Sequence, residues 1–281
     1  MKILFSKRCL EYSQPGHPES PQRVASAHRF LEEKGYEFIE PKPCKDEDLL
    51  GVHTEEFIGR VRNGEFFDLD TPNLPGVYDY AKLSAGAAIE AMWLALKGER
   101  AFSLMRPPGH HANQHRVGGF CYFNNMAISC KKALDSVVRV AIIDVDCHHG
   151  NGTQDIFMGD QRVLYVSLHQ SPLYPGTGLS SVENCLNYPL YPGAEEEEYL
   201  RTLKEALAEV KKFDPNLVGV SAGFDTYHED PVTNLGLEKS SFQKIGQMIA
   251  YLGKPTFVVL EGGYGDAFPE CVWQFLLGYE E

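Results

Sequence analysis

Four short segments of this 281-residue chain combine side chains that bind metals or transfer protons. Each follows a run of apolar or β-branched residues that predicts a strand, over residues 101–105, 138–145, 216–220 and 256–260. The carboxyl ends of parallel strands lie along one edge of a sheet, where ligands bind. We therefore expect one crevice to collect the four segments, which are Arg106–His111, Asp144–Asn151, Ser221–Asp225 and Glu261–Tyr264.

Asp146 and His148 form the core of a candidate metal site. They are two residues apart at the end of a strand, so their side chains point to the same side. Asp225 offers a third ligand from another strand, and three protein ligands with an open position are typical of catalytic zinc. Carboxylate-rich sites also suit iron or manganese. Alternatively, Asp146 and His148 are a salt-bridged pair that caps the sheet, but Asp225 and two further histidines at the same edge disfavour this.

Two adjacent histidines, His110 and His111, follow a double proline and a glycine. Imidazole titrates near neutral pH and suits proton transfer. Each ring needs a neighbour that fixes its tautomer, and Asp144 and Asn151 are the candidates, although Asp144 could instead bind a structural cation. Tyr264 follows two glycines that allow close backbone approach, so its hydroxyl could face a developing oxyanion, unless the ring simply packs.

Other functional classes lack support in the motifs. The segment Gly150–Asp155 resembles a dinucleotide-binding fingerprint, but the third glycine is missing. No Gly-x-Ser-x-Gly elbow of a serine hydrolase occurs. The seven cysteines are widely spaced without a Cys-x-x-Cys pair, which excludes a zinc ribbon. Because the first residues carry no export signal, we expect reduced thiols and a cytoplasmic protein.

Composition limits the partners. Hydrophobic residues make up 43% and charged residues 23% of the chain, as in soluble globular proteins. The net charge of −13 argues against nonspecific nucleic-acid binding, which needs a basic surface. No run approaches the ~18 apolar residues of a membrane span. We therefore expect no nucleic-acid or membrane partner, and a monomer or weak homo-oligomer.

Amphipathic stretches between the strands predict the helices that position these segments. In residues 195–213, glutamates begin the stretch and two lysines end it, which matches the helix macrodipole. Alternating strands and helices predict a single α/β domain over residues 1–281, with three αβα layers around a mainly parallel sheet. The other predicted helices are residues 20–34, 84–96, 124–134, 240–252 and 266–277, and further strands are residues 2–5 and 163–168.

Taken together, the motifs resemble the histone deacetylase superfamily, which includes acetylpolyamine amidohydrolases and acetoin-utilisation proteins. The resemblance runs from Lys2 to about Leu277. It implies the arginase–deacetylase fold and zinc-dependent hydrolysis of a linear amide. The motifs that carry it are Arg106–His111, Gly119–Asn125, Asp144–Thr153, Ser167–Gln170, Tyr174–Gly178, Ser221–Asp225 and Glu261–Tyr264.

The resemblance also implies roles for single residues. Asn151 in place of Asp, and Glu261 in place of Gly, are similar to the class II and prokaryotic branch. Asp144 would orient His110, and Asn151 would orient His111. The implied ligands of one catalytic Zn²⁺ are Asp146, His148 and Asp225. The implied catalytic residues are His110, His111, Tyr264, Asp144 and Asn151. A structural monovalent cation, K⁺, is expected on Asp144, Asp146, His148, Ser167 and Leu168.

The resemblance further implies a substrate tunnel. Phe120, next to Gly119, and Tyr174 match its aromatic walls, with Tyr174 in place of the usual phenylalanine. Asp70 resembles a rim aspartate that binds substrate amides, and Arg23 resembles an arginine of the entrance loop. Val232 stands where a polyamine-selective branch carries glutamate, and no long insertion like that of the polyamine enzymes occurs. We expect an acylated lysine in a peptide or protein, or a similarly slender acylated amine, with an acetylpolyamine as the alternative.

Two other hypotheses use the same fold. A dinuclear manganese ureohydrolase would need a second aspartate two residues after Asp225, where Tyr227 stands. A non-catalytic acyl-lysine reader would be expected to lack Tyr264, the metal ligands or the histidine pair, all of which are present.

Overall fold

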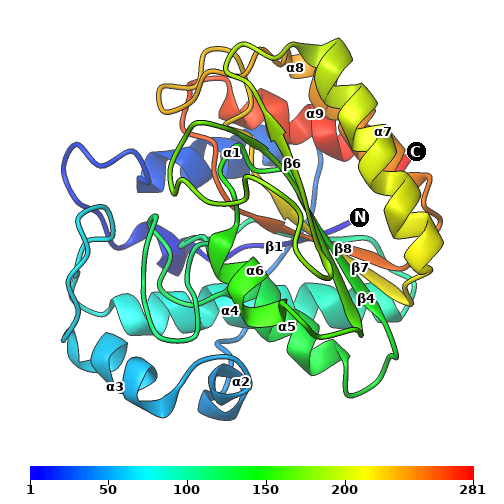
Figure 1. Ribbon diagram of the computed structural model, residues 1–281. Coiled ribbons are helices and arrows are strands. Elements are labelled where there is room, and N and C mark those ends of the chain that lie inside the picture. Colours follow the sequence, from blue (N-terminus) through cyan, green and yellow to red (C-terminus); the bar gives the residue numbers. More distant parts are fainter.

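An eight-stranded sheet forms the centre of the computed structural model, which describes all 281 residues (Figure 1). Neighbouring strands follow the order β2-β1-β3-β8-β7-β4-β5-β6, and every pair is parallel. The predicted sheet is therefore confirmed, and it is parallel throughout. The strands are β1 (Lys2–Leu4), β2 (Phe38–Ile39), β3 (Ala101–Ser103), β4 (Val140–Asp144), β5 (Val163–Gln170), β6 (Cys185–Leu190), β7 (Leu217–Ala222) and β8 (Thr256–Leu260).

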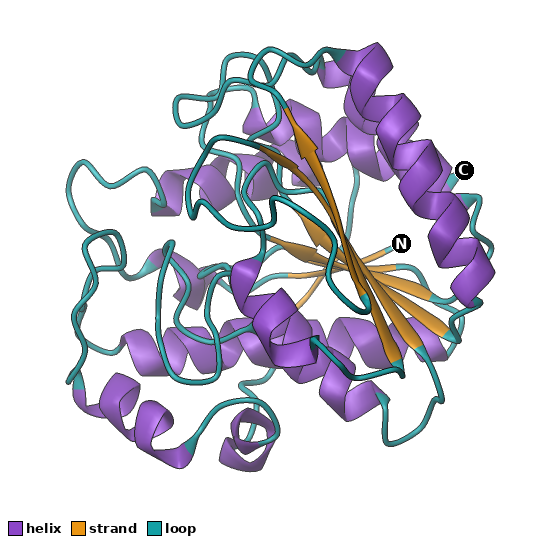
Figure 2. Ribbon diagram, in the orientation of Figure 1, coloured by secondary structure: helices purple, strands orange, loops and turns teal.

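Helices cover both faces of this sheet and complete the predicted three layers (Figure 2). The helices α4 and α5 lie on one face, and α1, α7, α8 and α9 lie on the other. None of the helices is long and apolar enough to cross a membrane. Their bounds are α1 (Pro21–Glu33), α2 (Asp46–Leu50), α3 (Glu55–Asn63), α4 (Val77–Leu96), α5 (Asn125–Ala133), α6 (Asn151–Phe157), α7 (Glu196–Phe213), α8 (Lys239–Ala250) and α9 (Phe268–Glu280), with a 3₁₀ turn over Lys7–Leu10.

The strands that lead to the site are buried along their whole length. All residues of β4, β5, β7 and β8 are buried, as expected for a parallel sheet covered on both faces. Helix α5 begins where the Asn124 side chain accepts a hydrogen bond from the Ala127 amide at 2.9 Å. All seven cysteines are buried and unpaired, in agreement with their spacing.

The strands β2 and β6 and the helices α2, α3 and α6 are missing from the sequence prediction. Strand β2 has two residues, and β6 contains Pro189, which a sheet tolerates at its edge because proline lacks an amide donor. Helix α6 begins inside a Gly-Asn-Gly sequence, where glycine lowers helix propensity. Helix α4 begins at Val77 rather than at residue 84. The sequence prediction omits its first turns because polar Asp79 and Lys82 interrupt their apolar pattern.

A buried ion-pair network supports the loop that carries the tandem histidines. Glu19 accepts hydrogen bonds from Nε and Nη2 of Arg106, each at 2.7 Å, and pairs with Nη1 of Arg23 at 3.1 Å. Arg106 Nη1 also donates to the carbonyl oxygens of Cys9 (2.7 Å) and Tyr12 (2.9 Å). Burial alone would raise the pKa of Glu19, but the charge of Arg106 holds it below its usual value.

Replacing Glu19 by alanine is expected to lower the free energy of unfolding by about 3–5 kcal/mol, because two buried guanidinium groups lose their only carboxylate. Urea denaturation measures this change. The matched control is Glu196→Ala, which removes a surface ion pair with Lys244. It is expected to lower the free energy of unfolding by at most about 1 kcal/mol. A loss for Glu19→Ala no larger than that of the control would contradict the structural role of the network.

Candidate active site

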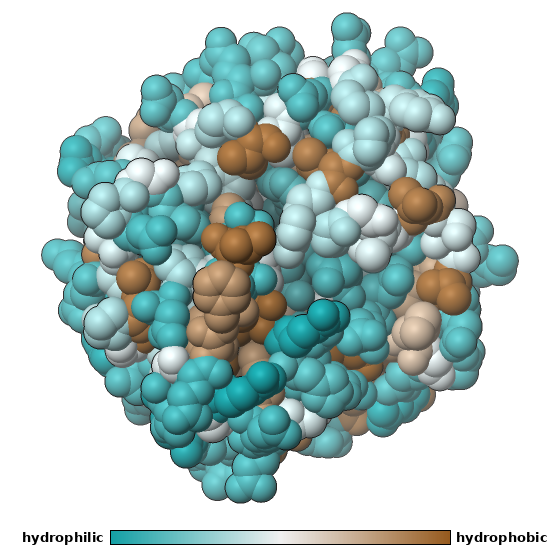
Figure 3. All heavy atoms as spheres, turned by 60° about the vertical axis from the view of Figure 1, so that its left-hand side comes forward, coloured by the Kyte–Doolittle hydropathy of each residue, from teal (hydrophilic) through white to brown (hydrophobic).

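The four chemistry-bearing segments meet at one edge of the sheet, as the sequence predicts. They follow β3, β4, β7 and β8, whose order in the sheet is β3-β8-β7-β4. The face toward which these strands point carries apolar side chains that are interspersed among hydrophilic ones (Figure 3). The side chains that converge below this face come from segments far apart in the sequence; Gly109 and Glu261, which are hydrogen-bonded, are 152 positions apart.

Asp146, His148 and Asp225 form a compact group in which one candidate ligand atom of each lies within 4.8 Å of the others. His148 Nδ1 lies 3.1 Å from Asp146 Oδ1 and 2.8 Å from Asp225 Oδ2. Asp225 Oδ2 is buried but accepts no hydrogen bond. Its short distance to His148 Nδ1 therefore indicates that these candidate ligand atoms point at a common position. Burial and the Asp146 carboxylate raise the pKa of Asp225 to about 7. A divalent cation bound by these three residues would give the free Asp225 oxygen a partner and would stabilise the charged form of Asp225. The residues therefore fit a metal of the zinc class.

Glycine residues and backbone amides keep this group open and oriented. A Cβ atom on Gly262 would lie 2.6 Å from Oδ2 of both Asp146 and Asp225, and one on Gly223 would overlap Asp146. The Gly262 amide donates to Asp146 Oδ2 at 2.7 Å, and the Cys147 amide donates to Asp225 Oδ1 at 2.8 Å. These hydrogen bonds fix the direction of each carboxylate before any ligand binds.

The tandem histidines make the two hydrogen bonds that the sequence predicts. His110 Nδ1 lies 3.1 Å from Asp144 Oδ2, and His111 Nδ1 lies 2.7 Å from Asn151 Oδ1. Because both oxygens only accept, each Nδ1 carries the proton and donates it, which leaves Nε2 toward the crevice. Burial disfavours a charged His110, but Asp144 and Asp146 raise its pKa to about 10. Burial and the neighbouring His110 and His148 lower the pKa of His111 well below its usual value.

Glu261 holds the histidine loop, a role that the sequence alone does not indicate. Its Oε2 accepts from the amides of Gly109 (2.7 Å) and His110 (3.2 Å), and its Oε1 accepts from the Ser221 hydroxyl at 3.1 Å. The carboxyl is fully buried, and burial raises its pKa to about 7. The available signal is a single acidic residue directly after the buried strand β8.

The aromatic residues expected in the tunnel pack against His111 and Tyr264. The Tyr174 ring packs edge-on against His111 with centroids 5.0 Å apart, and Phe120 packs edge-on against Tyr264 at 5.7 Å. Gly119 lies directly against the His111 ring, where any side chain would collide. Burial raises the pKa of Tyr264 well above its usual value, so its hydroxyl stays protonated and can donate.

The predicted rim residues separate into two groups. Asp70 is exposed, and its carbonyl oxygen accepts from His17 Nε2 at 3.0 Å, while the His17 ring packs 4.6 Å from Phe120. This places Asp70 near Phe120, one of the expected tunnel walls. Val232 is partly buried in the loop after β7, where its amide donates to Asp230 at 3.0 Å.

Arg23 is buried beside the turn that carries Tyr264, and its predicted contact with the substrate stays a prediction. Its side chain is buried, with 6% of the residue exposed, and donates to the carbonyl oxygens of Glu261 (2.8 Å) and Gly263 (2.5 Å). Its guanidinium lies 4.5 Å from the centroid of the Tyr264 ring. The reason is the buried carboxylate of Glu19, which binds Arg23 in the interior.

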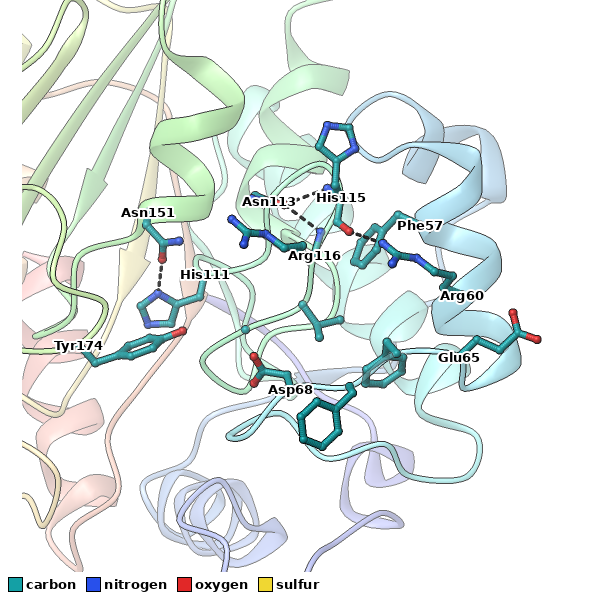
Figure 4. A pocket seen from close by; sticks show the side chains of 14 residues that line it. Phe57, Arg60, Glu65, Asp68, His111, Asn113, His115, Arg116, Asn151 and Tyr174 are labelled. Carbon is teal, nitrogen blue, oxygen red and sulfur yellow. Dashed lines mark hydrogen bonds between the residues drawn. The ribbon is translucent and has the colours of Figure 1, made fainter.

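A cavity of about 480 Å³ opens beside the histidine pair (Figure 4). Figure 4 shows His111, Asn151 and Tyr174 on one side, Arg60 and Glu65 on the far side, and Arg116 between them. The loop that includes Asp68 forms another wall. The cavity therefore offers side chains of both signs of charge next to the crevice.

The fold and this constellation are those of deacetylase-type α/β amidohydrolases, the class that the sequence predicts. The family model described as the histone deacetylase domain matches residues 17–278 of the chain. The chain belongs to the histone deacetylase family.

Individual relatives agree with this assignment. A probable deacetylase of Archaeoglobus fulgidus is 40% identical over 93% of this chain and 80% of its own length. A histone deacetylase-like amidohydrolase of Pseudomonas aeruginosa is 37% identical over 91% of this chain and 75% of its own length. The crystal structure of an acetylpolyamine aminohydrolase from Burkholderia pseudomallei superposes with a TM-score of 0.92 and 27% identity, covering 99% of this chain and 98% of that one. The arginase–deacetylase fold is thereby confirmed.

Proposed function

We propose that this protein is a zinc-dependent deacylase that removes acetyl or related acyl groups from lysine side chains or similarly slender amines. The observation that carries the proposal is the Asp146, His148 and Asp225 group, with its unused Asp225 oxygen, in one crevice with two oriented histidines and Tyr264. Zn²⁺ bound there would polarise the scissile carbonyl and acidify a water molecule.

The protein groups then divide the remaining work. His111, whose Nδ1 is occupied by Asn151, uses Nε2 to accept a proton from the attacking water and to return one to the leaving nitrogen. His110, paired with Asp144, stabilises the charge that builds up beside it. The protonated hydroxyl of Tyr264 donates a hydrogen bond to the developing oxyanion. The products are a carboxylate and a free amine.

The proposal includes a structural K⁺ beside this site. Asp144 and Ser167 are register partners on β4 and β5, which supports a shared ligand set at the end of these strands. The proposed ligands are the side chains of Asp144 and Ser167 and the backbone oxygens of Asp146, His148 and Leu168.

Two features fit an acyl-lysine substrate, and the second of them disfavours an acetylpolyamine. The rings of Phe120 and Tyr174 offer apolar faces to the methylene groups of a lysine side chain. Val232, rather than a glutamate, follows Asp230 and Pro231, so no carboxylate stands there for a distal ammonium. An acetylpolyamine remains the second candidate, because the superposed Burkholderia pseudomallei structure is titled an acetylpolyamine aminohydrolase.

Asp70→Ala is expected to lower kcat/KM for acetyl-lysine peptides by about one to two decades, because the exposed carboxylate would lose charge-assisted hydrogen bonds to substrate amides, worth roughly 1.5–3 kcal/mol. Acetylpolyamines offer no peptide amides, so their turnover is expected to change much less. Steady-state assays of both substrate classes measure the difference.

Asp79→Ala, an exposed aspartate at the start of α4, serves as the control and is expected to leave both rates unchanged. The same panel decides the substrate class of the wild-type protein. Hydrolysis of acetylpolyamines that is far faster than hydrolysis of every acyl-lysine peptide would refute the lysine preference. Equal losses for both classes in Asp70→Ala would remove Asp70 as a peptide contact.

A further inference from the structure

The turn that carries Tyr264 is held by a buried carboxylate from another loop. Oδ2 of Asp230 accepts from the amides of Tyr264 (2.7 Å) and Gly265 (3.2 Å), and Oδ1 accepts from the Val232 amide at 3.0 Å. Only 6% of Asp230 is exposed. A buried carboxylate that accepts three backbone amides fixes the local backbone strongly.

Arg23 holds the same turn from the other side. Its Nε and Nη2 donate to the carbonyl oxygens of Gly263 and Glu261, at 2.5 and 2.8 Å. Its guanidinium also lies 4.5 Å from the centroid of the Tyr264 ring. Backbone donors of the turn thus bind Asp230, and backbone acceptors bind Arg23.

The turn needs such external support because two glycines precede Tyr264. Gly263 has φ 115°, a conformation that other residues rarely adopt, and a Cβ there would lie 2.8 Å from atoms of Phe224 and Phe268. Glycine gives the chain this conformation but also more freedom to leave it. A small rotation in this turn would move the Tyr264 hydroxyl, which lies at the far end of a long side chain.

Asp230 also connects the turn to the metal group. It lies in the loop after β7, which also carries Asp225, the third candidate ligand, and the Thr233 hydroxyl of this loop donates to the Asp225 carbonyl oxygen. The Gly262 amide of the turn binds Asp146 Oδ2 at 2.7 Å. The candidate ligands and Tyr264 therefore share one set of backbone contacts.

We infer that Asp230 is a positioning residue that acts through the Tyr264 backbone and sets the place of its hydroxyl relative to the metal group, with Arg23 as the opposing support. The inference rests on the proposed role of Tyr264. Its physical basis is that a displacement of about 1 Å in a reacting group can lower a rate about 10²-fold.

A double-mutant cycle on kcat tests the inference. Asp230→Ala is expected to lower kcat by about 10- to 100-fold with KM changed less than about threefold, because the proposed substrate contacts Phe120, Tyr174 and Asp70 are not bonded to Asp230. Asp230→Asn keeps one acceptor oxygen and is expected to recover part of the loss. In a Tyr264→Phe background, Asp230→Ala is expected to lower kcat by less than about threefold, because the hydroxyl it positions is absent.

The control is Asp48→Ala, which removes another aspartate that caps an amide, that of Lys45 at 2.9 Å, far from the site. It is expected to leave kcat unchanged in both backgrounds. Zinc content and circular dichroism report on folding, and if Asp230→Ala does not fold, Asp230→Asn completes the cycle. An unchanged kcat in the folded Asp230 variant would overturn the positioning role. So would a decrease in kcat from the Asp230 substitution that is as large in the Tyr264→Phe background as in the wild type. Either result would leave the proposed role of Tyr264 intact. A Tyr264→Phe variant with wild-type kcat would overturn the role of Tyr264 and the inference with it.

Discussion

Tyr264→Phe is expected to keep its zinc and to lose about 10²–10³ in kcat, the usual effect of removing one oxyanion donor. The substitution deletes a single hydroxyl from a ring that packs against Phe120 and Arg23. Because the ring and its contacts remain, the loss reports on the hydroxyl rather than on packing. KM is expected to change little, since the hydrogen bond forms to charge that develops only during the reaction.

Steady-state kinetics together with elemental analysis measure both parts of this prediction. Tyr251→Phe removes a hydroxyl from a tyrosine that is 65% exposed on the surface, and it serves as the control with wild-type kcat. A loss below about threefold in Tyr264→Phe would mean that the hydroxyl does not meet the transition state.

Asp146→Ala is expected to lose its bound zinc and to lower kcat by more than about 10³-fold. This decrease exceeds the roughly 10- to 100-fold loss that follows removal of a group that only orients a metal ligand. Asp146 would supply one of three protein ligands, and its Oδ2 also receives the Gly262 amide. Its removal leaves His148 and Asp225, too few to hold zinc firmly.

Inductively coupled plasma mass spectrometry of the purified variant gives the metal content directly. Asp135→Ala, which removes an exposed aspartate, is the control and is expected to bind as much zinc as the wild type. Full zinc occupancy in Asp146→Ala would exclude Asp146 as a ligand.

The layers of the fold follow from the sequence because the central strands are buried on both faces. The apolar run 140–143 of β4, its neighbour β7 and the next strand β8 carry a pattern that no exposed segment would show. The edge strands β2 and β6 lack that pattern, since their residues are only partly buried or include a proline. Their pairing depends on neighbours that the local sequence does not reveal.

The same distinction applies to the site. Asp146 and His148 are recognisable because their spacing at a strand end suffices to place them together. The roles of Glu261 and Asp230 are not recognisable in the sequence. Each binds backbone amides of residues 34 to 152 positions away, and because nearly every residue has a backbone amide, no residue type marks the partner. The burial of Arg23 could not be predicted from the sequence, because arginine is mostly exposed in proteins and here pairs with the buried carboxylate of Glu19.

The most direct test of the proposed function is the metal dependence of acetate release from an acetyl-lysine peptide. The purified protein is stripped with a chelator, dialysed and assayed with and without one equivalent of Zn²⁺, and acetate and free lysine are both quantified. The stripped protein should be inactive, and added zinc should restore release of one acetate for each lysine freed. Undiminished hydrolysis by the stripped protein, or a zinc-loaded protein that binds the peptide without releasing acetate, would contradict the proposed function.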